Sequence, residues 1–311
     1  MRSLALILFA ITACRSAPVE PPAPRQAAAP VTPPEQLDPK VVARGAYVVA
    51  LAGCKACHSA MKNGEVDTTR PFAGGLEVTT PNGTWRAPNI TPDRNSGIGN
   101  WSETQLIQAI RRGIGRDNSK LLPVMPYPYY HRMTDSDAKA VVAFLRTQRP
   151  IYNKVARSDA RMATVDLKEP VNNVDDIEDP EAHGEYLASL MHCAACHTPK
   201  DGPHANAMLA GGVEIPADGR SIMSSNITPD MTTGIGGWSD EEIIVAIRTG
   251  KTPDGHTIEG PMAMYVDGWS TIEDADAAAL VAYLRSVPPA NHNIPEKQIG
   301  PVTQRAAMAS R

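Results

Sequence analysis

Aromatic side chains are scarce in this chain of 311 residues: Phe, Tyr and Trp together make up only 5%. Small domains with so few large rings have little side-chain volume with which to fill a core. Basic residues are not in excess either, since the net charge is −4, which argues against a nucleic-acid-binding protein. Charged residues make up 21% and hydrophobic residues 42%, as in a globular protein, and the length suggests about two domains.

Cysteine is also rare, and its five occurrences leave no pair for a disulfide. Four of them lie in two pentapeptides, CKACH at 54–58 and CAACH at 193–197. The spacing C-x-x-C-H is the covalent attachment signal for c-type haem, in which both thiols bond to the haem and the histidine binds the iron. The predicted attachment residues are Cys54, Cys57, Cys193 and Cys196, and the predicted proximal iron ligands are His58 and His197.

A zinc ion is the alternative group that such a motif could bind. A tetrahedral zinc site takes four nitrogen or sulfur ligands, and the first half of the chain has no second cluster of Cys or His. Two copies of the motif therefore favour two covalent haem c groups. Their apolar bulk also supplies the core volume that the aromatic residues do not.

Long apolar runs are absent at the start of the chain, where Leu4–Ile11 is too short to span a bilayer. With Arg2 before it, this stretch predicts a signal peptide over residues 1–13. The residues Ile11–Cys14 resemble a bacterial lipobox, which implies lipidation of Cys14; the alternative is a free thiol in an ordinary signal peptide. We therefore expect export to the periplasmic side, where haem is attached to cysteine. The residue after Cys14 is Arg15 and not the aspartate that resembles an inner-membrane retention signal in some bacteria. The outer membrane is therefore a compatible location for the anchored protein.

The second half of the chain repeats the first, with a period of about 137 to 139 residues. The repeat predicts a Pro- and Ala-rich lipid-anchored tether at 14–37, a first domain at 38–155, a linker at 156–177, a second domain at 178–295 and a tail at 296–311. The paired segments are GAY at 45–47 and GEY at 184–186, NITPD at 89–93 and 226–230, GIGNWS at 97–102 and GIGGWS at 234–239, and VAFLR at 142–146 and VAYLR at 281–285.

No strand pattern of any length is present, so each half is expected to be mainly α, with three to four helices and long loops around its haem. Asp-Pro pairs, capping boxes and glycines set the expected helix ends. First helices are expected after Asp38 and Asp179. Second helices are expected from Ser102 to Gly113 and from Ser239 to Gly250, and third helices from Thr134 and over Asp274–Arg285.

The sixth iron ligand of the first haem is expected in the loop between the second and third helices. Met125 lies there between prolines, whereas Met133 stands at the cap of the third helix and is the weaker candidate. A core methionine is the alternative interpretation of either residue. Methionine ligation raises the reduction potential and suits electron transfer.

Two methionines compete in the second half. Met264 matches Met125 in its distance from the third helix, whereas the Gly-Pro pair before Met262 resembles a loop that presents such a ligand. Our prediction is Met262, with Met264 as the rival. His204 and His256 could serve as nitrogen ligands, but exposed loop histidines are the simpler interpretation.

These motifs together resemble a two-domain, dihaem cytochrome c with class I type domains. They are similar to segments of the cytochrome subunits of membrane-bound alcohol and gluconate dehydrogenases, which usually carry three haems. The resemblance implies that the first helix of the first domain crosses the last with Gly45 and Tyr47 at Phe144. In the second domain, Gly184 and Tyr186 are implied to cross at Tyr283. It also implies that Trp101 and Trp238 donate hydrogen bonds to haem propionates; packing alone is the alternative role of both tryptophans.

Electron transfer is the function that these features favour, with a dehydrogenase, a quinol-oxidising complex, an oxidase or another cytochrome as donor and acceptor. The haem iron supplies the redox couple, and the protein sets its potential and its docking surface. The alternative is a haem enzyme, such as a dihaem peroxidase or a thiosulfate dehydrogenase, with a displaceable sixth ligand in the second domain. A lipid-anchored assembly subunit of a dehydrogenase is a third function, compatible with the first.

Overall fold

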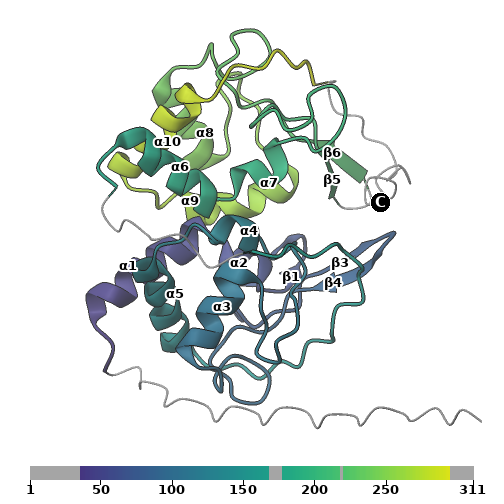
Figure 1. Cartoon of the computed structure of the whole chain (residues 1–311), viewed down its shortest axis with the longest axis vertical. Coiled ribbons are helices and arrows are strands. Elements are labelled where there is room, and N and C mark those ends of the chain that lie inside the picture. The colour runs from purple at the N-terminus through teal and green to yellow at the C-terminus, as the bar shows by residue number, and fades with distance from the viewer. Residues whose placement is uncertain (1–35, 168–176, 218–219, 295–311) are drawn as a thin grey trace, which may run out of the picture.

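The computed structural model describes residues 36–167, 177–217 and 220–294 and folds them into two stacked helical lobes (Figure 1). The predicted signal peptide, Cys14, most of the tether and all of the tail lie outside the described residues. The first lobe contains α1 (Pro39–Leu51), α2 (Cys54–Cys57), α3 (Glu103–Arg112), α4 (Tyr127–Tyr130) and α5 (Asp135–Thr147). The second contains α6 (Pro180–Leu190), α7 (Cys193–His197), α8 (Asp240–Thr249), η2 (Gly260–Tyr265), α9 (Val266–Trp269) and α10 (Asp274–Ser286).

The helices begin and end where the local sequence signals predict. Asp38 and Asp179 are the N-caps of α1 and α6, each followed by proline in the first turn. Capping boxes start α3 and α8, and a left-handed glycine ends each of them. The third helices were predicted from Thr134 and over Asp274–Arg285, and α5 and α10 agree to within one residue. The mainly α expectation is confirmed.

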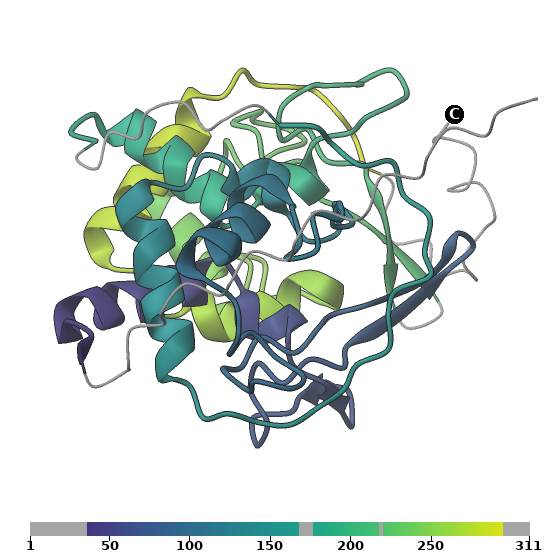
Figure 2. The ribbon, with the colours of Figure 1, turned by 60° about the horizontal axis from the view of Figure 1, so that its bottom comes forward.

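Three short antiparallel hairpins were not predicted from the sequence. They pair β1 (Met61–Lys62) with β2 (Glu65–Val66), β3 (Glu77–Thr80) with β4 (Gly83–Arg86), and β5 (Glu214–Ala217) with β6 (Arg220–Met223). Hairpins β3–β4 and β5–β6 lie on the same side of the molecule in both views (Figures 1 and 2). Strands of two to four residues are too short for an alternating pattern to stand out.

The first and last helices of each lobe cross at a glycine, as the resemblance implied. A Cβ atom on Gly45 would lie 1.9 Å from the carbonyl oxygen of Ala140, and one on Gly184 would lie 2.0 Å from that of Ala279. These contacts leave no room for any side chain, so glycine permits the close packing of α1 on α5 and of α6 on α10.

The two cores exchange one leucine. Leu51, at the end of α1, is fully buried in the core of the second lobe, and Leu190, at the end of α6, is fully buried in the core of the first. These leucines occupy equivalent positions of the repeat. Each lobe therefore completes its hydrophobic core with a side chain from the other.

Part of the predicted linker packs on the first lobe. The backbone NH of Asp159 donates to the carbonyl of Thr84 in β4 at 2.9 Å, and the NH of Val165 donates to the Tyr127 hydroxyl at 2.9 Å. Of the predicted linker, residues 156–167 and Ile177 are described. Within the described residues, no helix is both long and apolar enough to cross a membrane.

Candidate haem sites and the contact between them

Each C-x-x-C-H motif forms a short helix that begins after a left-handed residue. Gly53 (φ 66°) precedes α2 and His192 (φ 45°) precedes α7. A single helical turn places cysteines three residues apart on one face. The two sulfurs of each motif therefore face the same side, as two thioether bonds to one haem require.

The proximal histidines are oriented alike in both lobes. The Nδ1 atom of His58 lies 2.8 Å from the carbonyl oxygen of Pro88, and that of His197 lies 2.8 Å from the carbonyl oxygen of Ser225. A carbonyl oxygen only accepts, so Nδ1 carries the proton and Nε2 keeps its lone pair. Burial lowers the pKa of both histidines, which favours the neutral ring. A neutral imidazole fixed through its other nitrogen is the usual form of a metal ligand.

A cavity of about 2860 Å³ adjoins the first attachment motif. Ligand pockets commonly measure about 300–1,000 Å³, and close-packed interiors leave few voids larger than a water molecule. The first-lobe lining includes Cys54, Cys57, His58, Trp101 and Met125. These thiols, the ring nitrogen and the thioether are the donor set of a His/Met-ligated haem c, so the residues present fit the group.

The same cavity continues into the second lobe, where Cys196 and Met264 line it. Burial raises the pKa of the Cys196 thiol, and the neighbouring Cys57 thiol raises it further. The second cysteines of the two motifs are therefore close in space, although 138 residues separate them in the sequence. The structure brings the two attachment sites together, which the sequence did not indicate.

The candidate methionines differ in what surrounds them. In the first lobe, Met125 and Cys54 pack against one core cluster, while Met133 is 1% exposed within that core. In the second lobe, Met262 and Cys193 pack against the equivalent cluster. Met264 holds the position that Met125 has relative to the next helix and, like Met125, lines the large cavity.

The two tryptophans are half-buried in both lobes. Trp101 lines the large cavity and Trp238 packs against the second core. The backbone carbonyl of each accepts a hydrogen bond from an arginine of the last helix, Arg146 at 3.4 Å and Arg285 at 2.5 Å. Of the alternative nitrogen ligands, His204 stacks on His292 at 3.9 Å and His256 pairs with Asp254 on the surface.

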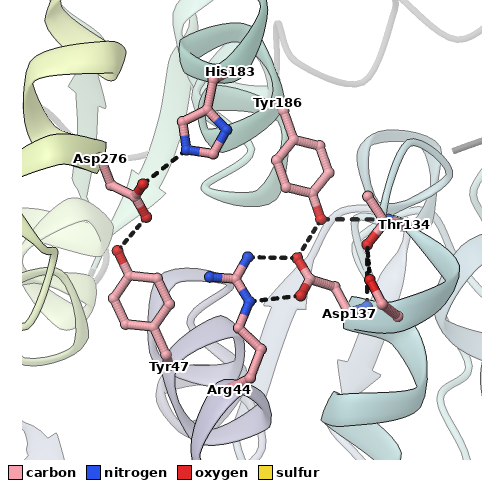
Figure 3. A network of polar contacts seen from close by, with 8 residues as sticks. Arg44, Tyr47, Thr134, Asp137, His183, Tyr186 and Asp276 are labelled. Carbon is pink, nitrogen blue, oxygen red and sulfur yellow. Dashed lines mark hydrogen bonds and ion pairs between the residues drawn. The ribbon is translucent and has the colours of Figure 1, made fainter. Parts of the chain in front are cut away.

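A polar network joins the lobes and was not found from the sequence (Figure 3). Tyr47 of α1 donates to Asp276 of α10 at 2.5 Å, and Tyr186 of α6 donates to Asp137 of α5 at 2.6 Å. The resemblance had placed these tyrosines at the helix crossing within each domain; their hydroxyls reach the last helix of the opposite lobe instead. The signal available in the sequence was that Tyr47 and Tyr186 stand at equivalent positions of the repeat.

Each of these two carboxylates also binds a second side chain, which comes from its own lobe. Arg44 makes a two-pronged ion pair with Asp137 at 2.7 and 2.8 Å, and His183 lies 2.7 Å from Asp276. The hydrogen bond to Asp137 raises the pKa of Arg44, while burial raises the pKa of Tyr47 and Tyr186. The carboxylates thus accept from both lobes at once.

Two domains, each with an attachment helix, an oriented histidine and a methionine loop, define a dihaem c-type cytochrome. The chain belongs to the cytochrome c family, whose sequence profile matches residues 42–149 and 181–288. It is a dihaem cytochrome c that carries electrons through two covalently bound haem c groups.

Relatives of known function agree with this class. The chain is 34% identical over 310 residues to the fructose dehydrogenase cytochrome subunit of Gluconobacter japonicus, covering 91% of this chain and 58% of the relative. It is 33% identical to the cytochrome c subunit of the quinone alcohol dehydrogenase of Gluconobacter oxydans, covering 82% and 56%. A dihaem cytochrome c-type protein of Cereibacter sphaeroides is 32% identical, with coverage of 83% and 92%.

The chain spans under three fifths of the length of those two dehydrogenase subunits, but nearly all of the dihaem relative. These relatives are cytochromes or cytochrome subunits, and they give no support to the peroxidase or thiosulfate dehydrogenase alternative.

Proposed function

We propose that this protein relays electrons from a dehydrogenase to a further acceptor through its two haems, which exchange electrons directly. The observation that carries the proposal is the single cavity that reaches from Cys54, Cys57 and His58 to Cys196. Bound haem supplies the one-electron Fe(III)/Fe(II) couple. The chain supplies the thioether sulfurs, the axial ligands and a common interior from which water is displaced.

The proposed attachment residues are Cys54, Cys57, Cys193 and Cys196, with His58 and His197 as proximal ligands. Met125 is the proposed sixth ligand of the first haem, because it lies in the cavity and on the core beside Cys54. Met262 is the proposed sixth ligand of the second, because it packs on the same core cluster as Cys193. Trp101 and Trp238 are proposed donors to haem propionates.

The dehydrogenase partner is supported by relatives whose names describe them as cytochrome subunits of fructose and alcohol dehydrogenases. Charge is divided between the domains in a way that suits two different partners. Residues 42–149 hold 14 Lys and Arg and 8 Asp and Glu, a net charge of +6. Residues 181–288 hold 5 Lys and Arg and 15 Asp and Glu, a net charge of −10. Each domain therefore attracts redox partners of opposite charge.

We further propose that the protein is exported and lipid-anchored at Cys14, after removal of residues 1–13. The lipobox-like context of Cys14 and the extracytoplasmic attachment of haem to cysteine support this. The domains are proposed at 38–155 and 178–295, with the linker at 156–177.

An optical redox titration of the purified protein tests the relay. Two low-spin haems with high midpoint potentials and a methionine-to-iron charge-transfer band are expected, because methionine ligation raises the potential. A high-spin haem that binds carbon monoxide or peroxide in the untreated protein would contradict it. Substituting Met262 and Met264 separately identifies the second ligand: the true ligand's loss removes that haem's share of the band.

A further inference from the structure

The segment that follows the candidate methionines of the second domain docks on the first domain. Tyr265 ends η2, three residues after Met262, and its hydroxyl lies 3.5 Å from the Sγ atom of Cys57. A sulfur bonded to haem carries no hydrogen, so in the haem-bound protein the tyrosine is the donor. The ring thus touches the attachment helix of the other haem.

Gly53 makes room for this ring. It lies directly before α2 with φ at 66°, and a Cβ atom there would be 2.3 Å from Cδ1 of Tyr265. Both the left-handed backbone and the close approach exclude a larger residue. At the equivalent position of the second domain stands His192, whose ring meets Tyr265 edge-on at 5.1 Å. Tyr265 is therefore wedged between the starts of both attachment helices.

The residues after Tyr265 fasten the same segment to α1. The indole Nε1 of Trp269 donates to the carbonyl oxygen of Leu51 at 2.9 Å in a buried contact, and its ring stacks on Tyr265 at 5.3 Å. A Cβ on Gly268 would lie 2.4 Å from the carbonyl oxygen of Ala50, so α9 packs directly on α1. Asp267 pairs with Lys55 of the first attachment motif on the surface, where such a pair contributes little.

The methionine loop itself has little internal support. η2 is a 3₁₀ helix of six residues with no buried side chain and no side-chain cap. Short 3₁₀ segments have poor hydrogen-bond geometry, and their position depends on neighbouring contacts. A ligand site held by a loose segment loses its geometry. The docked Tyr265–Trp269 segment is what fixes the end of this loop.

We propose that Tyr265 is a positioning residue that holds the methionine loop of the second haem against Gly53 and Cys57, so that sixth-ligand binding at the second haem depends on the first domain. The inference rests on the proposed ligation by Met262. In the first domain Pro126 stands at the place equivalent to Tyr265. The tyrosine that reaches the second attachment helix from there is Tyr130, whose ring meets that of His192 edge-on at 6.1 Å.

Tyr265→Ala and Gly53→Ala test the contact from its two sides in the purified dihaem protein. Tyr265→Ala removes the ring that packs between Gly53 and His192, and Gly53→Ala displaces that ring from the first domain. Each is expected to remove about half of the methionine-to-iron band, the share of one haem, and to lower one midpoint potential while the other stays within error. That haem then binds carbon monoxide without denaturant.

Matched variants separate positioning from general damage. Tyr265→Phe keeps the ring and is expected to retain the band and both potentials, with only a small shift from the lost hydroxyl. Tyr152→Ala removes a 63% exposed tyrosine and is expected to match the wild type. If Gly53→Ala does not yield folded protein, Tyr265→Ala alone carries the test.

Met262→Ala distinguishes the two ways of failing. If Met262→Ala leaves the band intact, the ligand assignment is wrong and the inference falls with it. If Met262→Ala removes half of the band while Tyr265→Ala and Gly53→Ala change neither band nor potential, the ligand assignment stands and the positioning role alone is overturned.

Discussion

The carboxylate of Asp230 shows how single residues shape the loops around each haem. Its Oδ1 atom accepts from the backbone NH of Thr233 at 2.7 Å and of Thr232 at 3.1 Å, and from both threonine hydroxyls. These hydrogen bonds, the backbone NH of Thr233 first, lower the pKa of Asp230 to about 2. In the first domain Asp93 accepts from the Ser96 hydroxyl and from the backbone NH groups of Ser96 and Asn95, and these hydrogen bonds, the hydroxyl first, lower its pKa.

The sign of this shift predicts an acid sensitivity. An unfolded aspartate has a pKa of about 3.9. The Asp230 carboxylate therefore stabilises the fold above about pH 4, and this contribution is lost as the pH falls towards 2. Asp230→Asn should lower the melting temperature at pH 7 and reduce its fall between about pH 4 and 2. Asp201→Asn, on an exposed loop, is the control, and an unchanged pH profile in Asp230→Asn would contradict the prediction.

The two interdomain tyrosines form a second matched pair. Tyr186 is 5% exposed and donates to the buried carboxylate of Asp137, whereas Tyr47 is half-buried and donates to Asp276. Hydrogen bonds to charged groups contribute about 1.5–3 kcal/mol, and more solvent at the site reduces this. Tyr186→Phe should cost about 2 kcal/mol and Tyr47→Phe roughly 1 kcal/mol in denaturant unfolding. Equal effects would contradict the ranking by burial, and no effect of either variant would show that these hydrogen bonds do not stabilise the contact between the lobes.

At the scale of elements, the ends of α1 and α6 connect the cores. Leu51 and Leu190 are fully buried, each in the core of the opposite lobe. Replacing a buried leucine by alanine costs about 2–5 kcal/mol, because apolar contact is lost and a cavity remains. Leu190→Ala should therefore destabilise the first domain and Leu51→Ala the second.

Hydrogen exchange measured by mass spectrometry locates that effect. Leu51→Ala is expected to speed exchange in α8 and α10, and Leu190→Ala in α3 and α5. Val245→Ala, at a 39% exposed position of α8, serves as the control and should leave both domains unchanged. If hydrogen exchange becomes faster only in the lobe that carries the substitution, the leucine does not complete the core of the opposite lobe.

Attachment, by contrast, is a local property of single elements. One helical turn after a left-handed residue presents both sulfurs, and a carbonyl of the following loop orients the histidine. The same geometry occurs in both lobes because the same sequence signals occur twice. The attachment residues could be predicted from the spacing alone, whereas the carbonyls of Pro88 and Ser225 that orient the histidines could not.

Across the whole molecule, the net charges of +6 over residues 42–149 and −10 over 181–288 oppose each other. Electrostatic steering changes association rates by about 10- to 1,000-fold at low salt. A small anionic redox reagent should therefore oxidise or reduce the first haem faster, and a cationic reagent the second, each by about tenfold at low ionic strength. Because electrons exchange between the haems, stopped-flow kinetics are measured on variants that keep one attachment motif, with the cysteines of the other replaced by alanine.

Salt provides the internal control for that experiment. Both preferences should shrink as ionic strength rises, because the screening length falls to about 8 Å at 0.15 M. Preferences that persist at high salt would indicate access to the haem, not charge, as their cause. Equal rates of both reagents at both haems in low salt would contradict the electrostatic separation.

The sequence by itself determined the parts of this protein that depend on neighbouring residues. The C-x-x-C-H spacing gave two covalent haems, and Asp38, Ser102 and Gly113 marked helix ends that the structure confirms. Such signals act over three or four residues, so they survive without knowledge of the fold. The repeat then showed that each haem motif belongs to a domain of its own.

Tertiary structure alone decided how the domains meet. The 3.5 Å approach of Tyr265 to Cys57, the exchange of Leu51 and Leu190 and the contacts of Tyr47 and Tyr186 all join residues of different domains. Periodicity identifies the buried face of a helix but not which partner covers it. The rivalry between Met262 and Met264 has the same origin. The two lie only two residues apart in η2, and only the packing shows that Met262 contacts the second core while Met264 lines the large cavity.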